Sequence, residues 1–166
     1  MTFLDYLLEF ILCFGAVFTF CGLINAPKNT VICSSAIGGA AYVVYRLISV
    51  NSEKEILAYF VASIVISVAS EICARLYKRP STVFIFPGII PLVPGVGLYN
   101  SMLCLVQNNH DMFIVKAVET VFIAGAIAIA VAIVHITARS IFPRKNGIIP
   151  LHNILKMMKD KDADKQ

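Results

Sequence analysis

Residues 86–101 read FPGIIPLVPGVGLYNS and place three prolines and three glycines inside an otherwise apolar stretch. Proline removes a backbone donor and clashes with the preceding helical turn, and glycine permits conformations that other residues resist. A single proline only kinks a helix, but Pro87, Pro91 and Pro94 together are expected to unwind it. Unsatisfied backbone groups at membrane depth are tolerated only where protein or water covers them. We therefore expect this break to line a cavity, and the alternative is a structural kink that shapes a helix bundle.

The composition indicates that this stretch belongs to a membrane protein. Of the 166 residues, 58% are hydrophobic and 14% are charged, and the charges gather in short islands between apolar runs. A helix needs about 20 apolar residues to cross a bilayer. Five runs have this length, and the sequence therefore predicts an all-α integral membrane protein with five transmembrane helices, the fourth broken by the proline–glycine motif. The runs are residues 4–24, 31–49, 56–77, 82–106 and 113–142.

The positive charges predict the orientation, because cytoplasmic loops carry an excess of Lys and Arg. With five spans and a cytoplasmic C-terminus, most basic residues fall inside, including the cluster RLYKR at residues 75–79. Four spans would place that cluster outside. We therefore expect the N-terminus outside, a transmembrane domain over residues 1–142, and a cytoplasmic amphipathic segment with a charged tail over residues 143–166.

Several classes of protein do not fit the sequence. The net charge of +4 comes largely from the cytoplasmic flanks, so it reflects topology and does not indicate nucleic-acid binding. Paired carboxylates, metal-ligand spacing and a nucleophile with a nearby base are not found, so we expect no enzyme activity, no metal and no cofactor. The five cysteines lie within predicted spans without a CxxC pair, which favours a packing role.

The break has the chemistry of an anion site. A helix that resumes around Val96 presents unpaired N–H groups and a positive dipole end, and its first turns offer hydroxyl and amide groups. Broken helices of this kind form substrate sites in secondary transporters. The residues predicted to bind a small carboxylate substrate are Pro87, Gly88, Pro91, Pro94, Gly95, Gly97, Tyr99, Asn100 and Ser101.

Ionisable residues within the spans are costly in lipid and are usually kept for a reason. Glu71 and Arg75 are four residues apart and can pair on one helical face. This pair is either an interfacial structural pair or a group that receives the substrate carboxylate or a coupling proton. Arg46 lies near the outer end of its span, where its side chain can reach the interface. We expect the deeper Glu9 and His135 to face protein or water.

Small residues predict close helix packing at two places. The run SSAIGGAAY occupies residues 34–42, and Ala124, Ala128 and Ala132 share one face of the last span. Small residues at this spacing let helix backbones approach closely. We expect both faces to pack against protein.

The stretch PGIIPLVPGVGLYNSM, the preceding ARLYKRPSTVF and the small-residue run after NAPKN resemble the threonine/serine exporter (ThrE) family. Within it, the chain is most similar to the small, separately encoded (YjjB-like) subunits of the two-component type. The resemblance implies a bacterial inner-membrane protein that exports threonine and serine or dicarboxylates such as succinate, with the proton-motive force as the driving force. It also implies a large ThrE-like membrane partner that supplies the cytoplasmic region missing here.

Two other functions stay open. A homo-oligomeric channel would use the broken helix as a filter without a partner chain. A structural or assembly subunit would use it only for stability. Substrate identity, coupling ion and stoichiometry are not readable from the sequence.

The orientation gives a direct prediction. In a cysteine-free background, a cysteine at Asn109 should react with an impermeant maleimide in intact cells, because the connection between the last two spans lies outside. A cysteine at Lys161 should react only after the membrane is opened. Labelling with the opposite sidedness would refute the five-span orientation.

Overall fold

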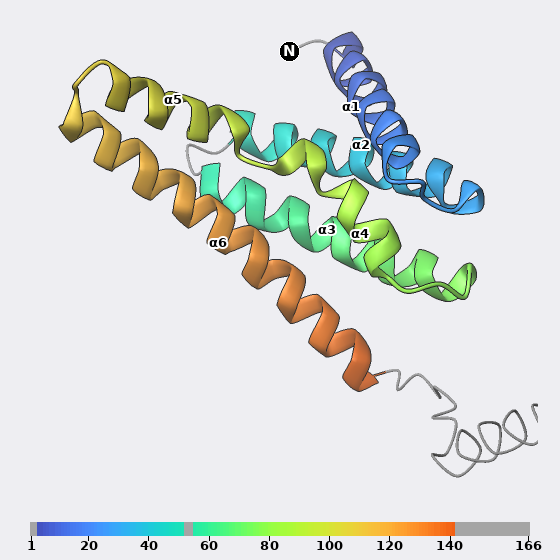
Figure 1. The fold of residues 1–166 in the computed structure, drawn as a ribbon. Helices are drawn as coiled ribbons and strands as arrows, with labels where there is room; N and C mark the ends of the chain where they lie inside the picture. Colours follow the sequence, from blue (N-terminus) through green and yellow to red (C-terminus); the bar gives the residue numbers. More distant parts are fainter. Residues whose placement is uncertain (1–2, 52–54, 142–166) are drawn as a thin grey trace, which may run out of the picture.

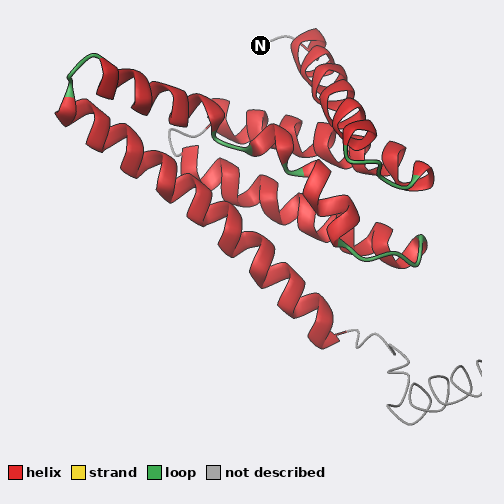
Figure 2. Ribbon diagram, in the orientation of Figure 1, coloured by secondary structure: helices red, strands yellow, loops and turns green. Residues whose placement is uncertain are grey.

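The described part of the chain is built from helices. This computed structural model describes residues 3–51 and 55–141, and no strand occurs among them (Figures 1 and 2). The expected cytoplasmic segment 143–166 lies outside the described residues. The elements in chain order are α1 (Phe3–Leu23), α2 (Lys28–Asn51), α3 (Glu55–Leu76), α4 (Thr82–Gly88), the 3-10 helix η1 (Ile90–Leu92), α5 (Gly95–Val106) and α6 (His110–Ile141). The all-α prediction is confirmed.

Four of these helices, α1, α2, α3 and α6, are long and apolar enough to cross a membrane. The pair formed by α4 and η1–α5 passes the same test and is bent by 41°, so the number of spans is five if this pair is one span. Large apolar side chains are exposed on the helix surfaces, among them Leu12 on α1 and Phe122 on α6. Exposed apolar surface on this scale is stable in lipid or against another protein.

Neighbouring helices pack in a chain of contacts. The helix α1 packs on α2, α2 on α3, α3 on α6, and α6 on α5, while the short α4 packs against α2 and α3 (Figure 1). The helix α1 therefore lies at one side of the bundle and α6 at the other. The broken segment α4–η1–α5 begins on the α2–α3 pair and ends alongside α6.

Three of the connections use the same helix-ending turn. Asn25, Lys78 and Asn108 adopt left-handed backbone conformations, with φ of 51°, 52° and 57°. In each case the N–H of the next residue donates to the carbonyl five residues back, at 2.9 Å between nitrogen and oxygen. This pattern satisfies carbonyls at the helix end and reverses the chain, and asparagine suits it because it tolerates the left-handed region. The following helix therefore returns antiparallel.

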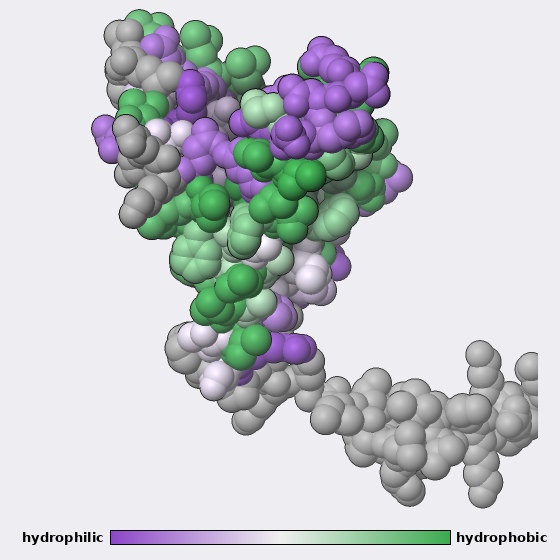
Figure 3. Space-filling model, turned by 90° about the vertical axis from the view of Figure 1, so that its left-hand side faces the viewer, coloured by the Kyte–Doolittle hydropathy of each residue, from purple (hydrophilic) through white to green (hydrophobic). Residues whose placement is uncertain are grey.

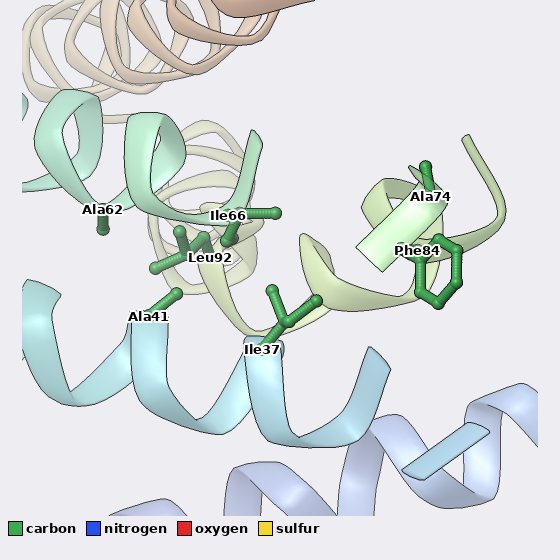
Figure 4. Packing of buried hydrophobic residues seen from close by; sticks show 7 residues of the cluster. All are labelled: Ile37, Ala41, Ala62, Ile66, Ala74, Phe84 and Leu92. Atoms are coloured by element: carbon green, nitrogen blue, oxygen red, sulfur yellow. The ribbon is translucent and has the colours of Figure 1, made fainter. Parts of the chain in front are cut away.

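The core of the bundle holds the broken segment in place. Leu92 of η1 is fully buried and lies between α2 and α3, where the small side chains Ala41 and Ala62 leave room for it (Figure 4). Ile66 closes the same cluster from α3. The 3-10 turn, which lies between Pro87 and Pro94, thus places one large side chain between two helices. The van der Waals contacts of Leu92 hold η1 at this position along α2 and α3.

A close backbone contact fixes the end of α4. A Cβ atom on Gly38 of α2 would lie 2.8 Å from Val17 Cγ2 and 3.2 Å from the carbonyl oxygen of Gly88. A Cβ atom on Gly39 would meet the ring and backbone of Phe10 at 3.0–3.1 Å. Two adjacent glycines therefore let α2 approach both α1 and the end of α4. The packing role predicted for the run at residues 34–42 is confirmed.

The second predicted small-residue face behaves differently. Ala124, Ala128 and Ala132 are exposed in the chain, and α6 instead buries Ile123, Ile127 and Ala130. The neighbours of α6, α3 and α5, contact it on the side of its buried residues. The prediction that the alanine face packs against protein is therefore not met by the described helices of this chain and stays a prediction about a partner.

The contact between Gly38 and Gly88 predicts the cost of a side chain. Gly38→Val should lower the free energy of unfolding by roughly 1–3 kcal/mol, because the bundle must open to admit it. The control is Gly15→Val, since a Cβ on Gly15 meets nothing within 4 Å. Thermal unfolding in detergent should show a lower midpoint for Gly38→Val only. Equal midpoints for the two variants would contradict the close contact.

Candidate transport site

A cavity of about 410 Å³ opens beside the break, between α2, α3, α5 and α6. The residues of the break that line it include Pro91 of η1, Pro94 before α5, and Gly95, Gly97 and Asn100 of α5. These five were predicted as substrate-binding residues. The cavity lies toward the end of the molecule at which α5 turns into α6. Figure 3 views the molecule from this end and shows hydrophilic residues gathered in its upper part, with hydrophobic residues below.

The remaining predicted substrate residues lie elsewhere. Pro87 and Gly88 are buried at the end of α4 and are not among the residues that line the cavity. Tyr99 is 66% exposed and does not line the cavity. Ser101 is buried, and its hydroxyl donates to the carbonyl of Leu98 in its own helix, at 2.8 Å. The structure thus divides the motif into residues that line the cavity and residues that shape the break.

The start of α5 faces the cavity without a cap. Pro94 occupies the N-cap position and offers no side-chain hydrogen bond. The N–H of Gly95 donates to the carbonyl of Val93, at 2.7 Å. The N–H of Leu98 donates to the carbonyl of Pro94, at 3.1 Å, whereas the N–H groups of Val96 and Gly97 precede the first intrahelical bonds and carry the positive dipole end. A Cβ on Gly95 would meet nothing within 4 Å, so the space in front of this turn is open.

A second glycine brings α5 against α6. A Cβ on Gly97 would lie 2.6 Å from the Thr120 hydroxyl oxygen, so only glycine allows this approach without a shift. The Thr120 hydroxyl donates to the carbonyl of Lys116, at 2.7 Å. The two glycines of α5 therefore have separate roles: Gly95 keeps the cavity open, and Gly97 joins α5 to α6.

Charged groups of both signs line the cavity. Lys116 Nζ lies 3.4 Å from Glu119 Oε2 on α6, and both side chains are partly exposed. Glu55, in the first turn of α3, also lines the cavity. The position of Lys116 and Glu119 at the cavity makes both side chains available to a charged ligand. One cation and two carboxylates thus surround the open start of α5.

Three tyrosines form an aromatic wall that the sequence reasoning missed. Tyr42 and Tyr45 of α2 have ring centroids 5.7 Å apart, and Tyr59 of α3 lies 4.4 Å from Tyr45. All three line the cavity. Tyr42 and Tyr45 are three residues apart, so the sequence itself indicates that both lie on one face of a helix. The wall supplies ring faces and hydroxyl groups to a ligand.

The residues predicted for charge or coupling lie outside the cavity. Arg46 Nε pairs with Glu9 Oε1 at 2.9 Å and joins α2 to α1. We expected Arg46 to reach the interface, and the structure instead gives it a partner from another helix. Glu71 Oε2 lies 3.9 Å from Arg75 Nη2, and Glu71 Oε1 lies closer, at 3.0 Å, to His135 Nδ1 of α6. The pairing of Glu71 with Arg75 was predicted, and the contact with His135 was not.

Four helices long and apolar enough to cross a membrane indicate a multi-pass membrane protein, and a broken helix beside a polar cavity is typical of the transporter class. Comparison with known families places the chain within that class. The family model described as "Threonine/Serine exporter, ThrE" matches residues 9–137, and the chain belongs to this family. Membership of an exporter family implies transport and not catalysis. Neither the search of curated proteins nor the search of solved structures gave a match.

Proposed function

We propose that this chain is the small membrane subunit of a secondary exporter of small carboxylated metabolites, with the substrate held at the break before α5. The observation that carries this proposal is the cavity that joins the open first turn of α5 to charged residues of α3 and α6. Backbone N–H groups at a helix start bind a carboxylate without a dedicated cation. The break therefore has a chemical use beyond bending the helix.

The charges of the cavity favour one substrate class over the other. The N–H groups of α5 and the Lys116 ammonium suit one carboxylate. Glu55 and Glu119 repel a second carboxylate and attract an ammonium group, and tyrosine ring faces also attract cations. We therefore favour zwitterionic amino acids such as threonine and serine over dicarboxylates such as succinate. Efflux measured across a panel of labelled acids distinguishes the two classes.

The proposed setting is the inner membrane of a bacterium, with the N-terminus outside and the C-terminus in the cytoplasm. Five spans are few for a complete transporter, since many transporters join two repeats around a central site. We propose that a large ThrE-like subunit supplies the second half. The exposed face of Ala124, Ala128 and Ala132 on α6 supports this partnership, because small residues allow another helix to pack closely.

The channel and the assembly subunit remain the competing functions. Purification distinguishes the first, because a stable homo-oligomer that conducts in liposomes without a second protein would favour a channel. Substitutions at the cavity distinguish the second, because in an assembly subunit they would change abundance and never substrate preference.

The open space at Gly95 provides the test of the transport site. Gly95→Leu should reduce efflux at least about 100-fold, because the added side chain occupies the position where the substrate meets the first turn of α5. Gly15→Leu on α1 is the matched control, since a Cβ added at either glycine meets nothing within 4 Å. Efflux is measured with the large subunit co-expressed and is normalised to the membrane abundance of each variant.

Normal efflux by Gly95→Leu at normal abundance would show that the break is a structural kink. Equal loss in Gly15→Leu would also contradict the proposed site, because the effect would then not depend on the cavity.

A further inference from the structure

A second polar cluster joins α3 to α6 far from the cavity along both helices. Glu71 Oε1 lies 3.0 Å from His135 Nδ1, and Glu71 Oε2 lies 3.9 Å from Arg75 Nη2. Arg75 Nη2 also donates to the backbone carbonyl of Ala138 on α6, at 3.3 Å. We refer to Glu71, His135 and Arg75 as the α3–α6 cluster. It is the polar link between the two helices at this end of the described chain.

The surroundings of the α3–α6 cluster are apolar. The Glu71 side chain is 16% exposed. Glu71 and Arg75 line a groove of about 420 Å³ between α3 and α6, whose other walls are mostly aliphatic, including Val68, Ile72 and Ile133. Ionisable groups within membrane spans are costly, and where they occur they mark ion pathways and proton relays. A packing role alone would be filled more cheaply by apolar residues.

The α3–α6 cluster can exchange a proton without rearranging its bonds. In the tautomer of His135 that donates from Nδ1 to Glu71, Nε2 keeps a free lone pair. A proton taken up on Nε2 makes the imidazole a cation, so its hydrogen bond to the Glu71 carboxylate becomes an ion pair. Proton uptake therefore tightens the link between α3 and α6, and release weakens it.

Few other titratable groups face the α3–α6 cluster from the described helices packed around it. On α6, Arg139 lies one turn beyond His135 and on the same helical face. The α4 sequence TVFIFPG contains no titratable side chain. On α2, Cys33 contacts Cys73 of α3. Uptake of one proton adds one positive charge to the cluster.

The same two helices line the cavity. Glu55 and Tyr59 belong to α3, whereas Lys116 and Thr120 belong to α6. The close contact between Gly97 and Thr120 ties α5 to α6. A movement of α6 relative to α3 would therefore carry α5 with it and change the width of the cavity.

We propose that the α3–α6 cluster is the proton-binding site that couples transport to a proton gradient. This proposal rests on the proposed export function. The bound proton holds α3 and α6 together in the arrangement described here. Its release returns the contact between His135 and Glu71 to a hydrogen bond from an uncharged imidazole and so weakens the link between the two helices. His135 is the proton carrier, Glu71 is its hydrogen-bond partner, and Arg75 balances the charge of the carboxylate.

The experiment uses inverted membrane vesicles from cells that co-express the chain with its large subunit. Uptake of labelled threonine is measured with an imposed pH gradient, and threonine exchange is measured at equal pH on both sides. Glu71→Gln and His135→Gln should lose the stimulation by the gradient and keep the exchange rate of the wild type. Glu9→Gln is the matched control, because Glu9 is also a span carboxylate in an interhelical pair, with Arg46. It should keep the stimulation.

A Glu71→Gln variant that keeps the full stimulation would overturn the proposal. Loss of exchange together with stimulation, in a variant of normal abundance, would also overturn it, because the cluster would then serve structure or substrate binding. If Glu71→Gln does not reach the membrane, His135→Gln decides by the same criteria, since it keeps the carboxylate and a hydrogen-bond donor. A wild-type complex that transports no threonine would contradict the proposed export function. Variants that keep both the stimulation by the pH gradient and the normal exchange rate would contradict only the coupling role of the cluster.

Discussion

The close approach of Gly38 to the backbone of Gly88 is the contact on which the broken segment depends. It sets the end of α4 against α2, and Leu92 of η1 then fills the space that Ala41 and Ala62 leave between α2 and α3. With both anchors in place, α5 must begin away from the axis of α4, at an angle of 41°. Its uncapped first turn consequently faces a cavity and not the core. The prolines interrupt the helix, and the packing of α2 determines where the interruption leads.

The polar groups of the chain are separated along the helices. The cavity gathers a lysine, two carboxylates and three tyrosines around the start of α5, and the α3–α6 cluster gathers Glu71, His135 and Arg75 toward the other end of α3. Along α3 between them lie the buried residues Ala62, Ser63, Ile66, Ser67 and Ser70. The proposed substrate site and the proposed proton site would then lie on one pair of helices, as coupled transport requires.

Much of this arrangement could be predicted from the sequence, because hydropathy determines which segments cross a membrane and proline determines where a helix is interrupted. The sequence could not predict which helix faces contact one another. Helices that are apolar all round show no periodicity that indicates which face meets which neighbour. For this reason the sequence did not show that Glu71 contacts His135, that Arg46 contacts Glu9, or that the alanine face of α6 is exposed in this chain.

Protection of Val96 by substrate tests most directly whether the break binds the transported molecule. Val96 lines the cavity and is 75% exposed, and its side chain makes none of the polar contacts assigned to the substrate. In a cysteine-free complex that still transports, a cysteine at position 96 should react more slowly with maleimide when threonine is present, while a cysteine at Asn109 should react at an unchanged rate. Labelling at position 96 that no transported acid slows, or that slows equally at position 109, would contradict a substrate site at the break.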